Sequence, residues 1–153
     1  MKKFGKWNAL FLIIGVVVVM LSLSGCMAPT FFASAPNTIY VTNVSDNTVS
    51  VINGQTNNVV ATIPTENSPQ EVGVNIVTGM IYVTNNSSNS VSVINGQTNN
   101  VTAIISVGNG PVGIEVNPTT DMIYVVNSQD NTVSVINGQT NNVVYYTCWK
   151  SAI

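Results

Sequence analysis

The apolar residues of this chain follow two patterns, one near its amino end and one in the remainder. An apolar run extends from Ala9 to Leu23. Beyond it, Val, Ile, Thr and Tyr come in short groups separated by clusters of Asn, Gly, Pro and Ser, which is typical of strands joined by turns. Between residues 70 and 111 this pattern predicts strands at 72–75, 80–85, 90–94 and 100–107. No segment after the first run has helical spacing with caps, so the pattern predicts an all-β fold.

The strand pattern repeats with a period of 42 residues. The tetrapeptide Tyr-Val-Thr-Asn at 40–43 returns at 82–85 and, as Tyr-Val-Val-Asn, at 124–127. Segment 49–59 also returns twice without a change. Aligned without gaps, the first two units are identical at 26 of 42 positions. A repeat of this length carrying four strands predicts a β-propeller rather than a β-solenoid, whose coils are shorter.

The distribution of apolar residues within the strands favours the same architecture. Residues 81–83 and 91–94 place apolar or small side chains on both faces of the predicted sheet. A strand of a β-sandwich would alternate apolar with polar residues, whereas a blade packed between two similar blades needs two apolar faces. Each unit also contains an Asn-Gly pair, which we expect to supply the positive φ of a sharp turn. These pairs are Asn53-Gly54, Asn95-Gly96 and Asn137-Gly138.

These motifs resemble the YVTN-type β-propeller repeats of cell-surface and surface-layer proteins. The similarity is carried by Tyr-Val-Thr-Asn, by Asn-Thr-Val-Ser-Val-Ile-Asn, by Asn-Asn-Val-Val-Ala-Thr-Ile, and by the Gly-x-Gly-Pro linker at 108–111. It covers residues 36–144. The resemblance implies a propeller fold, but it implies no particular activity, because propellers serve many functions.

The phase of the repeat predicts an incomplete propeller. The resemblance implies that the strand after each Pro linker is the innermost of its blade, so the first blade lacks its innermost strand. We expect units at about 37–69, 70–111 and 112–144, followed by a divergent tail at 145–153. The abrupt loss of the repeat suggests a truncated or frameshifted relative of a longer propeller. Uncovered end blades favour self-association, for example of two copies into a six-blade ring.

The amino-terminal segment has the features of an export signal. Lys2, Lys3 and Lys6 precede the apolar run, which is too short for a typical membrane span. The run ends in Leu-Ser-Gly-Cys at 23–26, which resembles a lipoprotein lipobox and implies lipid attachment at Cys26. We therefore predict a signal helix at 1–25, a tether at 26–36 and a membrane-anchored protein on the extracellular face of the cell envelope. An ordinary cleaved signal and an uncleaved anchor are the alternatives.

Charge narrows the choice of partners. Behind the predicted signal, Lys150 is the only basic residue, against the acidic residues Asp46, Glu66, Glu71, Glu115, Asp121 and Asp130. Such a surface cannot neutralise phosphates, which excludes nucleic acid as a partner. The membrane contact must then come from the lipid, and a surface protein or glycan is the expected further partner.

The residues offer little for catalysis. The sequence contains no histidine and no arginine, which removes the commonest general base and a frequent funnel residue of propeller enzymes. The acids are interpreted as solvated turn residues. We expect no cofactor and no metal, although Asp46-Asn47 and Asp130-Asn131 leave calcium as an alternative. The tyrosines of the repeat are expected in the core with their hydroxyls at a turn, the alternative being an aromatic ladder for sugars.

The remaining candidates are modifications. Asn43, Asn85, Asn86 and Asn100 begin Asn-x-Ser/Thr sequons and are candidate glycosylation sites. Cys148 beside Trp149 is interpreted as an inert thiol. The leading hypothesis is a non-enzymatic, lipid-anchored surface module with a structural, adhesive or protein-interaction role. A fragment of a propeller oxidoreductase or lactonase, and a truncated gene product without function, are the alternatives.

Overall fold

The computed structural model describes residues 37–147 of the 153-residue chain. This part is all-β apart from one 3-10 turn, η1 (Asn86–Ser88), and contains no helix long and apolar enough to span a membrane. The predicted signal helix, the lipobox, the tether before residue 37 and the tail beyond residue 147 lie outside the described residues. Eleven strands follow one another in chain order. They are β1 (Thr38–Asn43), β2 (Thr48–Asn53), β3 (Asn58–Pro64), β4 (Pro69–Asn75), β5 (Met80–Asn85), β6 (Ser90–Asn95), β7 (Asn100–Ser106), β8 (Pro111–Asn117), β9 (Met122–Asn127), β10 (Thr132–Asn137) and β11 (Val143–Thr147).

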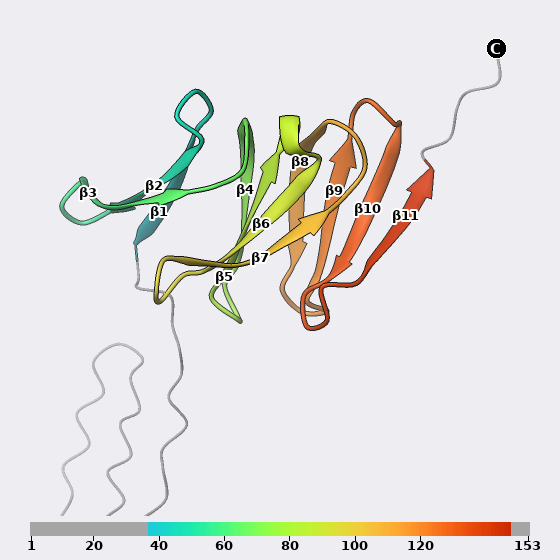
Figure 1. The fold of residues 1–153 in the computed structure, drawn as a ribbon. Helices are drawn as coiled ribbons and strands as arrows, with labels where there is room; N and C mark the ends of the chain where they lie inside the picture. Colours follow the sequence, from blue (N-terminus) through green and yellow to red (C-terminus); the bar gives the residue numbers. More distant parts are fainter. Residues whose placement is uncertain (1–36, 148–153) are drawn as a thin grey trace, which may run out of the picture. The chain divides into compact units, whose positions relative to one another are not determined.

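The strands form three antiparallel sheets in which consecutive strands are neighbours (Figure 1). The first sheet has the order β1-β2-β3, the second β4-β5-β6-β7 and the third β8-β9-β10-β11. Each sheet is a meander, because short turns join strands that are adjacent in sequence. Within the described residues the first sheet has three strands where the others have four, as predicted.

The hairpin turns correct one prediction about the Asn-Gly pairs. Gly54, Gly96 and Gly138 do not have positive φ; the left-handed residues of these turns are Asn57, Asn99 and Asn141, with φ between 56° and 58°. The glycines are needed for close approach instead. A Cβ on Gly96 would lie 2.7 Å from the carbonyl oxygen of Gly79, and a Cβ on Gly54 would lie 2.7 Å from that of Asn37.

The asparagine of each pair has a separate role in the same turn. The Asn95 Oδ1 accepts hydrogen bonds from the backbone N–H groups of Gln97 (2.9 Å) and Thr98 (3.1 Å). The Asn53 and Asn137 side chains do the same in their own turns. The side chain thus caps the turn while a later asparagine reverses the chain.

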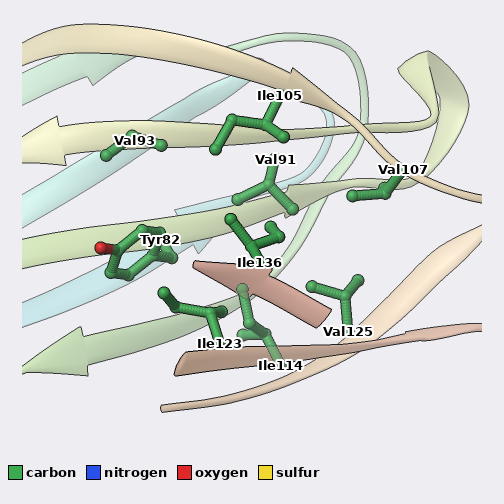
Figure 2. Close-up of a cluster of buried hydrophobic side chains, with 9 residues drawn as sticks. All are labelled: Tyr82, Val91, Val93, Ile105, Val107, Ile114, Ile123, Val125 and Ile136. Atoms are coloured by element: carbon green, nitrogen blue, oxygen red, sulfur yellow. The ribbon is translucent and has the colours of Figure 1, made fainter. Parts of the chain in front are cut away.

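The second sheet is apolar on both faces, as a blade between two blades must be. The face towards the first sheet carries Ile81, Val83 and Ile94, which are fully buried in one cluster with Val49, Val51 and Ile63. The opposite face carries Tyr82, Val91 and Val93, which pack against the third sheet (Figure 2). Adjacent residues of one strand therefore belong to different cores, and each core joins two sheets.

The third sheet departs from the repeat in its outer strand. In the first two sheets the outer strand carries a bulge, so that Val51 pairs with Ala61 but Ile52 pairs with Val59. β11 has no such bulge: Ile136 pairs with Val143, and Val135 pairs with Val144. Val144 therefore takes the place that alanine holds in the other sheets, and Tyr146 takes the place of an isoleucine. The divergent tail predicted to start at residue 145 still contributes its first residues to this strand.

Candidate functional site

The loops between sheets are tied to the sheets on both sides. In the loop before β4, the Ser68 N–H donates to Asn47 Oδ1 of the first sheet (2.8 Å), and the Asn67 N–H donates to Ser88 Oγ in the second (3.0 Å). The left-handed backbone at Asn47 (φ 55°) aims its amide at the loop. Each loop thus fixes the distance between two sheets.

The loop before β8 repeats this arrangement with a charged partner. The Gly110 N–H donates to Asn89 Oδ1 (2.9 Å), and both the backbone N–H and the side-chain amide of Asn109 donate to the carboxylate of Asp130. The bond from the Asn109 backbone, and then the bond from its side chain, lower the pKa of Asp130 below its usual value. These bonds also engage both carboxylate oxygens of Asp130.

Two acidic side chains connect the second and third sheets. The Glu71 Oε2 accepts the backbone N–H of Ile114 across the innermost strands β4 and β8 (3.0 Å). The Asp121 Oδ1 accepts from Asn75 Nδ2 (2.7 Å). The prediction that all the acids are solvated turn residues is wrong for Glu71 and Glu115, which lie within β4 and β8.

The repeated tyrosines confirm the core interpretation at two of three positions. Tyr40 packs against the core between the first two sheets, and its hydroxyl lies 3.1 Å from where a Cβ of Gly96 would stand. Tyr82 is 1% exposed between the second and third sheets. Burial, with a smaller contribution from the Asp121 carboxylate, raises the pKa of Tyr82 to about 12. Tyr124, at the same position of the third unit, is 42% exposed.

The asparagine that ends each Tyr-Val-Thr-Asn motif holds two strands together. The Asn85 Nδ2 donates to Ser90 Oγ (3.1 Å) and Ser92 Oγ (2.9 Å). Asn43 and Asn127 bond their own hydroxyl pairs in the same way. This role was not predicted from the sequence, although the spacing of Asn, Ser/Thr and Ser at 43, 48 and 50 recurs in all three units.

The four candidate glycosylation sites differ in access. Asn85 is fully buried, so a glycan there would require its side chain to leave the core. Asn43 is half-buried and hydrogen-bonded, and the Asn86 amide donates to the Pro111 carbonyl (3.3 Å). Asn100 is exposed at the start of β7, where the fold accommodates a glycan. Cys26, Cys148 and Trp149 lie outside the described residues.

Residues 37–147 contain no group of three or more acidic, cysteine or histidine side chains placed to hold a metal ion. In each of the two loops considered for calcium, one side chain uses its oxygens for bonds within the fold. The Asn47 Oδ1 accepts from Ser68, and both carboxylate oxygens of Asp130 accept from Asn109. The hydrogen-bonding capacity of these loops stabilises contacts between sheets.

Within residues 37–147, the two outermost sheets each present an uncovered apolar face. We call the face of the first sheet that points away from the second sheet the leading face; it carries Ile39 (47% exposed), Val41 (42%), Val59 (58%) and the half-buried Ile52. The corresponding face of the third sheet is the trailing face. It carries Tyr124 (42%), Val126 (46%), Val144 (53%), Tyr146 (57%), the half-buried Val133, the buried Val135 and, beside Tyr124, the exposed Glu115. Exposed apolar groups of this extent mark interaction sites.

The fold is that of a β-propeller segment. Hydrazine synthase of Kuenenia stuttgartiensis is 27% identical, with a TM-score of 0.69 over 73% of this chain and 32% of that protein. Virginiamycin B lyase of Staphylococcus aureus is 16% identical, with a TM-score of 0.62 over 72% of this chain and 37% of the lyase. The WD40 repeats of RRP9 match with a TM-score of 0.68 at 13% identity, over 76% of this chain and 37% of that protein. The chain thus spans about a third of these propellers. No family model and no curated protein matches the sequence.

Proposed function

We propose that this chain is a lipid-anchored β-propeller module of the YVTN type, exported to the cell surface, with a structural, adhesive or protein-interaction role. The observation that carries this proposal is the pair of uncovered apolar faces on an otherwise well-packed repeat array. The polar residues that the repeat places in its loops bind neighbouring sheets rather than forming a reactive centre. What remains available for a partner is the surface of the sheets.

The absence of histidine and arginine supports a non-enzymatic role. The carboxylates of Glu71, Asp121 and Asp130 accept hydrogen bonds from backbone N–H groups or amides of neighbouring sheets and loops, which supports a structural role for them. The similarity to hydrazine synthase favours a second candidate, a segment of a propeller enzyme. Formation or cleavage of a bond by the purified chain would favour that candidate.

The anchor and the location are tested together. The full chain is produced in a bacterium that processes lipoproteins and is labelled with an alkyne analogue of palmitate. We expect label on the wild-type chain and on Cys148→Ser, and none on Cys26→Ser. We also expect a protease added to intact cells that display their lipoproteins outside to degrade the wild-type chain. Labelling of Cys26→Ser, or full protection of the wild-type chain, would contradict the proposal.

A further inference from the structure

We infer that the trailing face of one copy of this chain docks on the leading face of a second copy, head to tail. The inference rests on the proposed function, because it names the partner of the faces that carry it. We call the face of a sheet that points towards the next sheet along the chain its rear, and the opposite face its front. The chain contains two internal interfaces, and each joins the rear of one sheet to the front of the next. The leading face is the front of the first sheet and the trailing face is the rear of the third, and neither takes part in these two interfaces.

The trailing face matches the rear surfaces that are buried inside the array. Tyr124, Val133 and Val135 stand one repeat after Tyr82, Val91 and Val93, which form the rear of the second sheet and are at most 3% exposed. At the outer strand, the missing bulge places Val144 and Tyr146 where the second sheet has Ala103 and Ile105. Both replacements keep the face apolar and enlarge it.

The leading face matches the buried front surfaces equally closely. Ile39, Val41 and Ile52 precede Ile81, Val83 and Ile94 by one repeat, and those three residues are fully buried against the first sheet. Val59 corresponds to Val101, which packs against the same cluster. The leading face carries no charged residue, and the trailing face carries one, the exposed Glu115, which pairs with Tyr124 in the sheet. Inside the array the Glu71 carboxylate accepts the Ile114 N–H between the second and third sheets, so a carboxylate on a rear surface can be paired across such an interface.

A turn beside the leading face has the shape that receives the tyrosine of a preceding sheet. Inside the array the Tyr40 hydroxyl lies against Gly96, whose N–H donates to the Gly79 carbonyl (3.0 Å). The first sheet has the same turn: the Gly54 N–H donates to the Asn37 carbonyl (2.6 Å). Within the described residues no tyrosine lies against this turn. Tyr124 of a second copy has the repeat position that would place its hydroxyl there.

The two faces differ, so the contact is heterologous and not two-fold symmetric. Such a contact closes into a ring if the rotation between copies allows it and otherwise extends into a chain of copies. A face that docked on an identical face would join two rear surfaces or two front surfaces, an arrangement that neither internal interface contains. The internal interfaces are therefore the template for the contact between copies.

Complementation between two variants tests the inference. The full chain is purified in mild detergent, and its mass is measured by sedimentation velocity over a range of protein concentrations. Ile39→Glu blocks the leading face and Val126→Glu blocks the trailing face. Both positions are about half exposed, so the fold tolerates the carboxylate. Gln97→Glu, at an exposed turn residue of the second sheet, is the matched control for the added charge.

We expect the wild-type chain and Gln97→Glu to associate equally and each face variant alone to associate at least about a hundredfold more weakly. An equimolar mixture of the two face variants should form a 1:1 dimer, because one trailing face and one leading face remain intact. Val41→Glu replaces Ile39→Glu if the latter loses its β-sheet circular dichroism.

A monomeric wild-type chain, or a mixture that stays monomeric, would overturn the inference. Association of Ile39→Glu alone would instead indicate contact between two trailing faces. None of these results bears on lipid labelling at Cys26, so the proposed location stands or fails separately.

Discussion

Tyr82 and Tyr124 occupy the same position in consecutive repeats, yet Tyr82 is 1% exposed and Tyr124 is 42% exposed. The local sequence around them is nearly the same, and both lie in the second strand of a four-stranded sheet. The difference is that the third sheet covers Tyr82, whereas no described residue covers the face on which Tyr124 lies. The comparison of the two tyrosines therefore separates the burial that comes from packing between sheets from the burial that comes from local structure.

Truncation of these two tyrosines should have unequal effects on stability. We expect Tyr82→Ala to lower the free energy of unfolding by about 3–5 kcal/mol, because it removes a large side chain from a packed core. Tyr124→Ala should cost under about 1 kcal/mol in dilute protein, where the trailing face is solvated. Urea denaturation of the full chain followed by circular dichroism measures both values. Equal losses would show that Tyr82 does not depend on the third sheet.

The raised pKa of Tyr82 predicts loss of stability in alkali. The Tyr82 hydroxyl ionises at about 12 in the folded chain, against 10.0 for an unperturbed tyrosine. The unfolded chain therefore releases this proton first, so the stabilisation is complete below pH 10 and is lost as the pH rises towards 12. Burial also raises the pKa of Tyr40, so the comparison is made in a Tyr40→Phe background. There, absorbance at 295 nm should show a late-ionising tyrosine that Tyr82→Phe removes and Tyr124→Phe leaves in place. A late component that persists without both Tyr40 and Tyr82 would refute the assignment.

Two glycines near the innermost strands should respond differently to alanine. A Cβ on Gly108 would lie 2.5 Å from Asn127 Nδ2, and Asn127 is fully buried and held by Thr132 and Ser134. We expect Gly108→Ala to destabilise the chain by about 1–3 kcal/mol, since the buried amide must shift. The nearest atom to a Cβ on Gly113 is 3.5 Å away, so Gly113→Ala should change stability by under about 0.5 kcal/mol. Thermal unfolding of the two variants, each compared with the wild-type chain, measures both changes; equal losses of stability would contradict this prediction.

The hydrogen bonds from Asn109 to the Asp130 carboxylate should be lost at low pH. Because hydrogen bonds from Asn109 lower the pKa of Asp130, the contact is present above the usual pKa of 3.8 and is lost as the pH falls through the lower folded value. The amide proton resonance of Asn109 should therefore shift with a midpoint below that pH. Asp130→Ser introduces the residue found at the equivalent Ser88, which accepts from Asn67. This variant should keep the loop in place and abolish the shift; a shift that remains would point to another titrating group.

The positions of the strands could be predicted from the sequence because the same pattern of residues occurs three times. The strands expected at 80–85 and 90–94 correspond closely to β5 and β6, and the three-stranded first sheet followed from the phase of the repeat. The turns were less predictable. The Asn-Gly pairs were expected to supply positive φ. The structure shows instead that a side chain on the glycine would collide with a backbone carbonyl from an earlier part of the chain. The sequence of the turn alone does not reveal that contact.

The polar side chains were the least predictable part of the candidate site. Asn85 begins a sequon, which suggested glycosylation, and only the adjacent strand shows that its amide is bonded to two serines. Glu71 was interpreted as a solvated turn acid, whereas the third sheet brings a backbone N–H to its carboxylate. A pattern of residue types does not specify which donor from another repeat will face a given oxygen.

The sequence by itself determined the repeat, the all-β class and the two apolar faces of each unit, since these depend on periodicity and on β-branched and aromatic content. The tertiary structure decided which of the equivalent faces are buried, which asparagines hold neighbouring strands and loops, and where β11 loses its bulge. The physical reason is that burial and hydrogen-bond partners depend on what lies opposite a residue, and identical repeats acquire different neighbours according to their place in the array.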